Sequence, residues 1–276
     1  ARTVIHTDSD FRFAKIDWEK TRAACQNQWA GLLGHTTILT QGFIGQDPLG
    51  RTTTLGREGS DFTAAILASS LDAESVTIWK DVPGVLNADP RYFSTTKLLN
   101  HISYQEAIEL AFYGASVIHP KTLQPLQRKE IPLYVKSFIN PKDAGTKVSK
   151  GVPIDPEIPC FIVKKDLALI RLSSLDFSFI IEKNISDIFS LLDKHKMKVD
   201  LIQNSAISFS VCIENNYNNL ERLLLHLKAK YKVKSYQAVK LYTIRHYDAT
   251  AVRELEKGKQ ILLKQVTPDI MQIITK

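Results

Sequence analysis

In the first half of this chain, short strand-like stretches alternate with helical patterns, and this order limits the fold more than any other feature. Residues 36–40 are rich in β-branched side chains and predict a strand, and an alanine-rich helical pattern follows from about Asp61 to Leu71. Residues 75–79 predict the next strand. A strand, a helix and a strand at this spacing form a βαβ unit, whose two strands run parallel. The sequence therefore predicts an α/β fold with an at least partly parallel sheet.

The loop that precedes this helix, residues 52–61, concentrates groups that bind anions. Its two glycines permit a positive φ or a close approach of the backbone to a ligand, and Ser60 or Asp61 is expected to cap the helix. The first-turn N–H groups favour a negative charge, and Arg57 adds a planar fork suited to a carboxylate or phosphate. Asp61 adds a carboxylate suited to an ammonium group. From these residues alone, a ligand site and a plain helix cap are equally acceptable interpretations.

A second dense loop, residues 80–91, follows the strand at 75–79 and carries charged side chains. In open α/β sheets, ligands bind beyond the carboxyl ends of parallel strands. We therefore expect this loop and the 52–61 loop to lie side by side at one edge of the sheet.

The other elements of the first half are marked by capping and turn residues. Ser103 and Glu106 form a capping box that opens a helix ending at Gly114, and Pro120 fits the first turn of a further helix. The expected elements are helices at 17–33, 103–114 and 120–128 and a strand at 132–138. Residues 146–159 are rich in proline and glycine, and we expect them to be a linker.

The second half has a different order of elements. Between residues 167 and 236 the patterns read strand, helix, strand, strand, helix, strand, which is a ferredoxin-like unit. The expected strands are 167–172, 199–203, 207–213 and 233–236, and the helices are 185–195 and 220–231. Residues 160–166 and 237–276 are expected to pair into a second, incomplete copy, into which the first copy is inserted.

Composition and charge exclude several classes of protein. The chain is 44% hydrophobic and 24% charged, as globular proteins are, and it has no apolar run near the roughly 20 residues of a membrane helix. Three widely spaced cysteines suit a reducing cytoplasm. Residues 1–160 carry 17 basic and 17 acidic residues, whereas residues 161–276 carry 19 and 12. The excess lysines are interleaved with acids and lack grouped aromatics, so we expect solvated faces and no nucleic-acid partner.

Short catalytic motifs are mostly absent. The chain has no Walker loop, no GxGxxG fingerprint after a strand, no HExxH and no GxSxG, and its seven histidines show no metal-ligand spacing. We therefore expect no metal held by a dedicated set of protein ligands.

Five motifs in series resemble the aspartate kinase family, in its order and at its spacings. They are residues 41–45, 52–61, 79–85, 88–91 and 112–120. The later half resembles the paired regulatory ACT domains of that family. The resemblance implies that residues 1–145 are the C-terminal part of an amino-acid-kinase αβα sandwich with a mostly parallel sheet. After the linker, it implies two ferredoxin-like ACT domains, one inserted in the other.

The resemblance also implies an activity. Aspartate kinases transfer the γ-phosphoryl group of ATP, with Mg²⁺, to the side-chain carboxylate of L-aspartate, which gives 4-phospho-L-aspartate. This reaction is the first step of lysine, threonine and methionine synthesis, and it is feedback-regulated through ACT domains. The implied partners are L-aspartate, ATP and an amino-acid effector, lysine or threonine, and the implied assembly is a cytoplasmic homodimer formed through the ACT domains, with no membrane.

Site residues follow from the matching motifs. The substrate site would contain Phe43, Arg57, Glu58, Gly59, Ser60 and Asp61. The nucleotide site would contain Lys80, Asp81, Leu86, Asp89, Arg91, Ser116 and Val117. An effector would contact Asp200, Asn204 and Ser205.

Four of these positions depart from the family pattern. Glu58 stands where glycine is usual, and Leu86 stands where tyrosine is common. Lys80 replaces a threonine and Ser116 replaces a lysine, so we expect Lys80 to supply the phosphate-facing charge that Ser116 lacks.

The front of the chain departs further, because it has no counterpart of the family's lysine-bearing glycine-rich loop. Ala1 aligns with the middle of the family's kinase domain, so we expect the chain alone to lack kinase activity. Turnover of ATP and aspartate by residues 1–276 would contradict this expectation. The alternative is a non-catalytic, amino-acid-binding ACT regulatory subunit, but a start in mid-domain without a methionine favours the enzyme.

Overall fold

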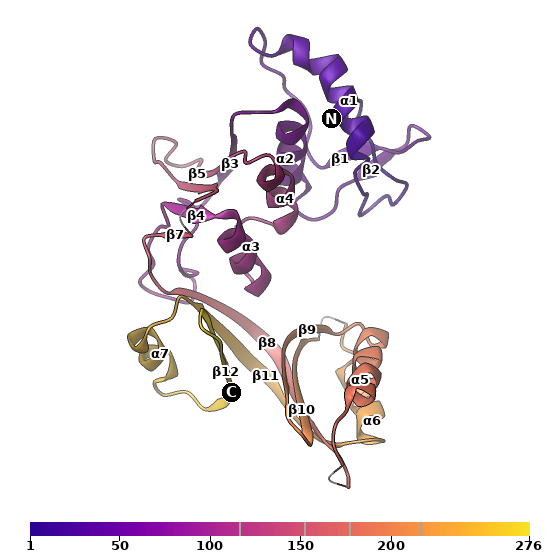
Figure 1. Cartoon of the computed structure of the whole chain (residues 1–276), viewed down its shortest axis with the longest axis vertical. Helices are drawn as coiled ribbons and strands as arrows, with labels where there is room; N and C mark the ends of the chain where they lie inside the picture. Colours follow the sequence, from indigo (N-terminus) through magenta and orange to yellow (C-terminus); the bar gives the residue numbers. More distant parts are fainter. Residues whose placement is uncertain (116, 152, 177, 216) are drawn as a thin grey trace. The chain divides into compact units, whose positions relative to one another are not determined.

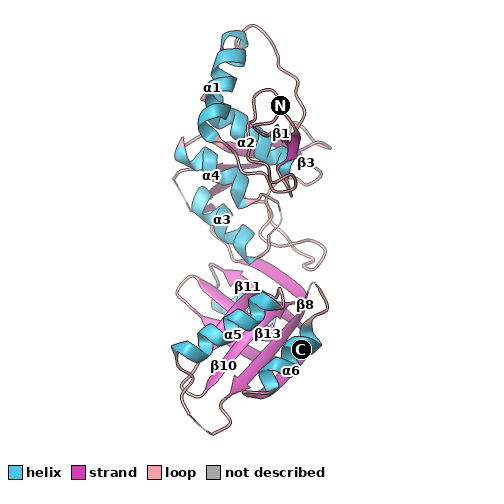
Figure 2. Ribbon diagram, turned by 90° about the vertical axis from the view of Figure 1, so that its right-hand side faces the viewer, coloured by secondary structure: helices cyan, strands magenta, loops and turns pink. Residues whose placement is uncertain are grey.

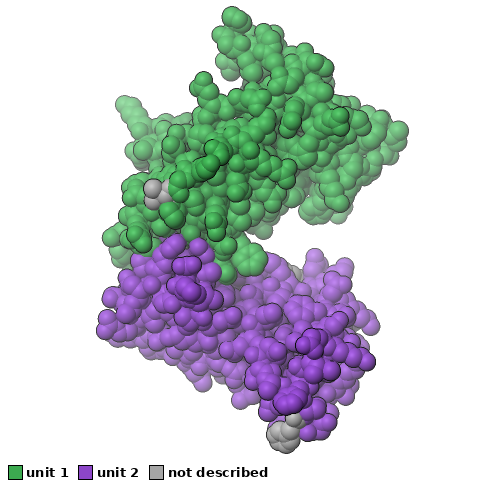
Figure 3. Space-filling view, in the orientation of Figure 1, with its two compact units in different colours: residues 1–158 green, residues 159–276 purple. Residues whose placement is uncertain are grey.

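The chain folds into two compact units, Ala1–Ile158 and Pro159–Lys276 (Figures 1 and 3). A computed structural model describes residues 1–115, 117–151, 153–176, 178–215 and 217–276. Among these described residues, none of the helices is both long and apolar enough to cross a bilayer. Each unit has its own sheet and its own core, and each is treated by itself below.

Unit 1 combines helices with a mixed sheet. Its helices are α1 (Trp18–Trp29), the 3-10 turn η1 (Ala30–Leu32), α2 (Gly59–Leu71), α3 (Tyr104–Tyr113) and α4 (Pro120–Arg128). Its strands are β1 (Ile44–Gln46), β2 (Thr52–Thr54), β3 (Val76–Lys80), β4 (His101–Ser103), β5 (Leu133–Ser137), β6 (Thr146–Ser149) and β7 (Ile154–Asp155). The five-stranded sheet has the order β3-β5-β6-β4-β7, and both β3–β5 and β4–β6 are parallel. The predicted α/β fold with a partly parallel sheet is confirmed.

The strand predicted at residues 36–40 does not form. Leu39 is 97% exposed, and no neighbouring strand pairs with this segment in the described structure. β-Branched residues form a stable strand only when they pack against a neighbouring strand. The chain forms the antiparallel hairpin β1–β2 instead, so α2 is entered from a separate two-stranded sheet. The predicted βαβ unit at this place is therefore wrong.

The predicted helix boundaries around α3 and α4 are confirmed by their caps. Ser103 Oγ accepts the N–H of Glu106 at 3.0 Å, and Gly114 ends α3 with a φ of 121°. Pro120 opens α4, and His119 Nδ1 accepts the N–H of Lys121 at 3.1 Å. His119 therefore has a structural partner at the start of α4.

Residues 146–159, expected to be a linker, contain two strands of the sheet. Strand β6 pairs with β4 and β5, and β7 pairs with β4. Thr146 is buried, and its hydroxyl donates to Leu99 O at 2.6 Å and accepts the Val85 N–H at 2.8 Å. The prolines and glycines lie in the turns around these short strands, which is why the sequence lacked a strand signal there.

Unit 2 is built around one antiparallel sheet with the order β12-β13-β11-β8-β10-β9. Its strands are β8 (Cys160–Ser173), β9 (Lys198–Asn204), β10 (Ser208–Glu214), β11 (Lys232–Arg245), β12 (Ile261–Val266) and β13 (Ile270–Thr275). Its helices are α5 (Glu182–Lys194), α6 (Leu220–Lys228) and α7 (Ala249–Glu256). The elements from β8 to β11 follow the predicted order of a ferredoxin-like unit.

Strands β8 and β11 each run through both halves of this sheet. The sequence predicted a break in each strand, but the chain stays extended through irregular points at Asp166 (φ 58°) and Ala238 (φ 52°). The pairing register shifts between Tyr236 and Leu241, as at a β-bulge. Residues 160–164 pair with residues 241–245 of β11, so β8 and β11 lie side by side in both halves of the sheet.

The helices α5 and α6 pack on a common apolar core with β8 and β10 (Figure 2). Within this core, Ile188 of α5, Leu223 of α6 and Leu172 of β8 are fully buried. Alternate residues of β8, such as Leu169, belong to a second cluster. Because successive side chains of a strand point to opposite faces, the sheet is buried on both faces at β8.

A pair of histidines joins the ends of α5 and α6. His195 Nε2 lies 3.1 Å from His226 Nδ1, so one of the two nitrogens must accept and remain unprotonated. Burial lowers the pKa of His195 below its usual value of 6.5, and the neighbouring His226, Lys194 and Arg222 lower that pKa further. Neutral His195 therefore contributes stability that is present above its unfolded-state pKa of 6.5 and is lost as the pH falls through its lower, folded-state pKa.

We therefore expect acid to loosen the contact between α5 and α6. In hydrogen exchange, the amides of these helices should lose protection between pH 7.5 and pH 5.5, and the His226→Gln variant should lose less. The control is a His35→Gln variant, which replaces an exposed histidine of unit 1 and should follow the wild type. Equal pH dependence in wild type and His226→Gln would contradict the role of this pair.

Candidate functional site

The loop between β2 and α2 enters the helix through two residues with positive φ. Gly56 has a φ of 78°, and Glu58 occupies the N-cap position with φ 55° and ψ 30°. No side chain caps α2, because Ser60 and Asp61 already lie within its first turn. The prediction that Ser60 or Asp61 caps the helix is therefore wrong. The helix N-terminus instead keeps its first N–H groups free of side-chain caps, which suits an anion.

Phe43 and Gly59 fix the position of this loop. The Phe43 N–H donates to Thr63 Oγ1 at 2.8 Å, and the Leu55 N–H donates to Phe43 O at 2.9 Å. A Cβ added at Gly59 would lie 2.8 Å from Phe43 Cβ, so glycine is required by close approach and not by a positive φ. The ring of Phe43 is 51% exposed, next to the first turn of α2. Sequence reasoning overlooked Thr63, which holds the backbone of Phe43 from inside α2.

Arg57 and Glu58 give the loop opposite charges at adjacent positions. The Arg57 side chain is 81% exposed, and its Nε lies 4.0 Å from Glu58 Oε1. Glu58 Oε2 is buried and has no hydrogen-bond partner among the described residues. The guanidinium is thus available to an incoming carboxylate or phosphate. The Glu58 carboxylate occupies the neighbourhood that such an anion would enter.

Replacing Glu58 by glycine should stabilise the protein. A left-handed backbone costs a residue with a Cβ about 1–2 kcal/mol, and the substitution also removes an unpaired buried oxygen, so we expect the free energy of unfolding to rise by about 1 kcal/mol. Urea denaturation followed by tryptophan fluorescence measures this. The Glu58→Ala variant is the matched control, since it removes the carboxylate but keeps the Cβ at the same φ. Equal stability of the two variants would show that the backbone is not strained.

The two loops meet through one ion pair. Lys80 Nζ, at the carboxyl end of β3, donates to Asp61 Oδ2 of α2 at 2.7 Å. The two side chains are only 24% and 17% exposed. Lys80 shares its face of β3 with the buried Val76 and Ile78, because side chains alternate along a strand. The two loops are therefore in contact, as predicted, but they do not follow successive strands of one sheet, because β2 belongs to the separate β1–β2 hairpin.

The rest of the second loop is held by internal contacts. Arg91 forms a bidentate ion pair with Asp89, in which Nη2 lies 2.6 Å from Oδ2 and Nε lies 3.0 Å from Oδ1. The hydrogen bond and charge of Asp89 raise the pKa of Arg91. Leu86 forms a β-bridge with Leu98, and Asp81 is exposed. Arg91 is therefore committed to Asp89, whereas Asp81 is open to a ligand.

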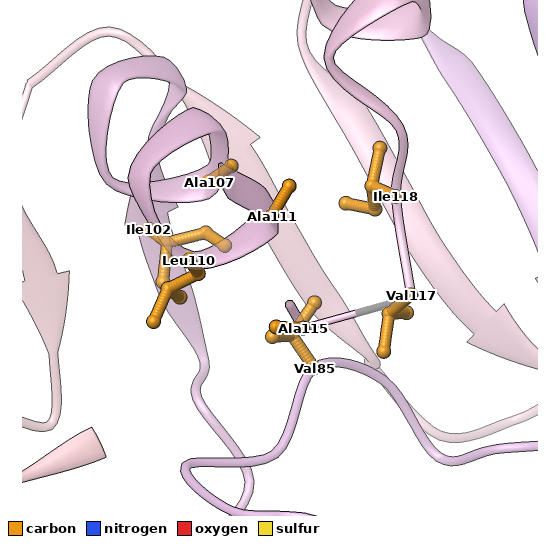
Figure 4. A pocket seen from close by; sticks show the side chains of 8 residues that line it. All are labelled: Val85, Ile102, Ala107, Leu110, Ala111, Ala115, Val117 and Ile118. Atoms are coloured by element: carbon orange, nitrogen blue, oxygen red, sulfur yellow. The ribbon is translucent and has the colours of Figure 1, made fainter. Parts of the chain in front are cut away.

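A small apolar pocket lies behind the second loop, between α3 and the segment that follows it (Figure 4). Its lining consists of Val85, Ile102, Ala107, Leu110, Ala111, Ala115, Val117 and Ile118. Among the described residues, all of the side chains that line it are apolar, so none of them would orient a phosphate or an amino acid. Val117 lines this pocket, and its assignment to a nucleotide site stays a prediction, whereas Ser116 lies outside the described residues.

In unit 2, the residues proposed to bind an effector are not gathered at one point. Asp200 is buried, and its Oδ1 accepts Lys164 Nζ at 2.5 Å, whereas its Oδ2 has no partner among the described residues. Burial raises the pKa of Asp200 despite the Lys164 ammonium. Asn204 and Ser205 are exposed at the other end of β9, and Asn204 is about 13 Å from Asp200 along the strand. Sequence reasoning missed Lys164, which reaches Asp200 from β8.

The described residues contain no group of three or more His, Cys, Asp or Glu side chains placed to hold a metal ion. Arg57 and Lys80 are cationic groups at the N-terminal end of α2, where Lys121 Nζ also lies 6.0 Å from the centre of the Phe62 ring, and Asp81 is an exposed carboxylate of the second loop. Together with the N-terminus of α2, they form a site for a ligand that carries negative charge.

Known proteins resemble this chain in sequence and in fold. Residues 3–137 match the model of the amino acid kinase family. The chain is 39% identical over 201 residues to the lysine-sensitive aspartokinase 3 of Escherichia coli, a match that covers 73% of this chain and 44% of that protein. The chain thus spans less than half the length of this relative.

Two solved structures resemble the whole chain. Escherichia coli aspartokinase III in complex with lysine and aspartate is 31% identical, with a TM-score of 0.80, over 99% of this chain and 64% of that one. The same enzyme in complex with aspartate and ADP is 30% identical, with a TM-score of 0.76, over 99% of this chain and 65% of that one. Both units are therefore included in the likeness. The chain belongs to the amino acid kinase family, and its relatives within that family are aspartokinases.

Proposed function

We propose that this chain supplies the amino-acid site, and part of the nucleotide site, of an aspartate kinase that uses ATP with Mg²⁺. The observation that carries the proposal is the contact between Lys80 and Asp61. This contact brings the N-terminus of α2, with the exposed guanidinium of Arg57, next to the loop that follows β3. An amino acid and a phosphate, bound one to each loop, would be neighbours.

Residues of the α2 loop would bind L-aspartate, and residues of the second loop would bind ATP. The exposed guanidinium of Arg57 suits the α-carboxylate of L-aspartate, the Asp61 carboxylate suits its ammonium group, and Ser60 is exposed beside them. Phe43 would cover the apolar part of the substrate. On the other loop, Lys80 would face a phosphate of ATP, while Asp81 offers Mg²⁺ the oxygen ligand that it prefers.

The reaction requires that the two reactants are held in line and that the negative charge of the phosphates is neutralised. One carboxylate oxygen of L-aspartate forms a bond to the γ-phosphorus, and the bond from that phosphorus to the oxygen of the leaving ADP breaks. The products are 4-phospho-L-aspartate and ADP, and no proton has to be removed from the attacking carboxylate. Bound Mg²⁺ would neutralise phosphate charge, and the cationic side chains of this chain would hold the two reactants in line.

An assay of ADP release tests this function. Because the chain spans 44% of the length of its Escherichia coli relative, the assay uses this chain joined to the N-terminal part of that relative. We expect turnover that depends on both L-aspartate and MgATP. A well-folded fusion protein that releases no ADP in the presence of L-aspartate would contradict the proposal.

We also infer that unit 2 binds an amino-acid effector, lysine or threonine, in a homodimeric cytoplasmic enzyme. Support comes from the buried Asp200 carboxylate, whose second oxygen could accept a ligand ammonium, and from the lysine in the related Escherichia coli structure. Calorimetric titration with lysine, threonine and methionine tests the inference. An absence of heat with all three amino acids would contradict it.

A further inference from the structure

The ion pair between Lys80 and Asp61 blocks one of the two groups that the substrate needs. Asp61 is the carboxylate proposed to bind the substrate ammonium, yet an ammonium of the chain itself already lies 2.7 Å from its Oδ2. With 17% of the Asp61 side chain exposed, little of its surface remains for a second cation. Unless Lys80 moves away, a substrate ammonium would have to share this carboxylate with it.

Lys80 is also the cation best placed to respond to a phosphate. It ends β3 at the edge of the sheet where the second loop begins, and Asp61 is its ion-pair partner within the described structure. A lysine ammonium on its flexible stem can exchange one anion for another without a change of the backbone. Arg91 differs from Lys80, since it forms a bidentate pair with Asp89 of its own loop and its side chain is 74% exposed.

From these two points, we propose that Lys80 couples the binding of the two ligands. Without nucleotide, its ammonium neutralises Asp61. When nucleotide binds, the ammonium turns to a phosphate and leaves Asp61 free for the ammonium group of the amino acid. The inference rests on the proposed function and makes Lys80 a positioning residue that favours binding of the nucleotide first.

The alternative is that the ion pair only stabilises the packing of α2 against β3 and does not open when a ligand binds. The two cases predict opposite changes in amino-acid affinity when Lys80 is removed. If the pair only stabilises the packing, the affinity should fall. If Lys80 blocks Asp61, the affinity should rise in the absence of nucleotide. The second ion pair of α2, between Lys129 and Asp72 at the far end of the helix, provides a matched control.

The experiment measures L-aspartate affinity of the full chain by calorimetry, with and without saturating MgADP. In the wild type, we expect MgADP to raise the affinity by roughly five- to 100-fold, the usual range for coupled sites. In Lys80→Met, aspartate should bind more tightly than in the wild type without MgADP, and the gain from MgADP should disappear. Lys129→Met should behave as the wild type does. The NMR signal of the Lys80 ammonium should shift when MgADP alone is added.

The outcomes separate this inference from the proposed function. Aspartate binding that persists with unchanged coupling in Lys80→Met, or that weakens in this variant without MgADP, overturns the inference and leaves the function standing. A Lys80 signal that does not respond to MgADP overturns it too. If the wild type binds no aspartate under either condition, both the function and the inference fail.

Discussion

Replacing Gly145 by alanine should destabilise unit 1 by about 3–4 kcal/mol, the largest effect that we expect from one added methyl group. Gly145 precedes β6 and has a φ of 71°, and a Cβ there would lie 2.1 Å from Val135 O. That oxygen belongs to the backbone of β5, so it cannot move aside without disturbing the pairing of β5 with β6. Steric overlap therefore adds to the cost of a left-handed conformation.

The control for this prediction is Gly50→Ala. Gly50 has a similar φ of 75° but no atom within 4 Å of its added Cβ, so this variant should lose only about 1 kcal/mol. All three tryptophans, Trp18, Trp29 and Trp79, lie in unit 1, so their fluorescence during urea unfolding reports on this unit. Equal losses in the two variants would mean that the overlap with Val135 relaxes at no cost.

Removing the guanidinium of Arg57 should lower the affinity for L-aspartate by about 10- to 100-fold, which corresponds to the 1.5–3 kcal/mol of a charged hydrogen bond. The side chain is 81% exposed and makes one long contact, to Glu58 at 4.0 Å, so Arg57→Ala should unfold at the same urea concentration as the wild type. Calorimetry measures the loss of affinity.

Arg57→Lys tests the geometry of this contact. Lysine keeps the charge but not the planar fork, so its affinity should lie between those of the wild type and Arg57→Ala. An affinity that is unchanged in Arg57→Ala would place the substrate carboxylate elsewhere.

Local signals predicted the elements that carry their own caps or periodicity. Ser103, Gly114 and Pro120 set the limits of α3 and α4 in the sequence as they do in the structure. The strands and helices of unit 2 were predicted in the right order because their apolar alternation and helical periods are regular. Cap residues and regular apolar patterns were therefore enough to predict these helices and strands.

Features that depend on distant partners were predicted poorly. Residues 36–40 have strand-forming side chains but no neighbouring strand, whereas Thr146 pairs in β6 because Leu99 and Val85 lie beside it. The long strands β8 and β11 were each predicted as two strands, because irregular points at Asp166 and Ala238 interrupt the apolar pattern. In the structure both residues keep a left-handed backbone, yet each strand continues past them.

In the candidate site, too, local features were predicted and contacts between distant residues were not. The two loops could be predicted from their glycines and charged residues, and their closeness was predicted too, but from a βαβ unit that does not form. The partners of individual charges could not be predicted, because Lys80 with Asp61 and Lys164 with Asp200 join residues from different elements. Those ion pairs decide which carboxylates are free for a ligand.

The most direct test of the amino-acid site is a titration of the ¹⁵N-labelled chain with L-aspartate in the presence of MgADP, followed through the backbone amide signals. We predict that the largest shifts fall on residues 57–62 and on Lys80 and Asp81, and that Arg57→Ala greatly reduces them. Shifts confined to unit 2, or shifts on the α2 loop that persist in Arg57→Ala, would contradict the assignment of this loop as the aspartate site.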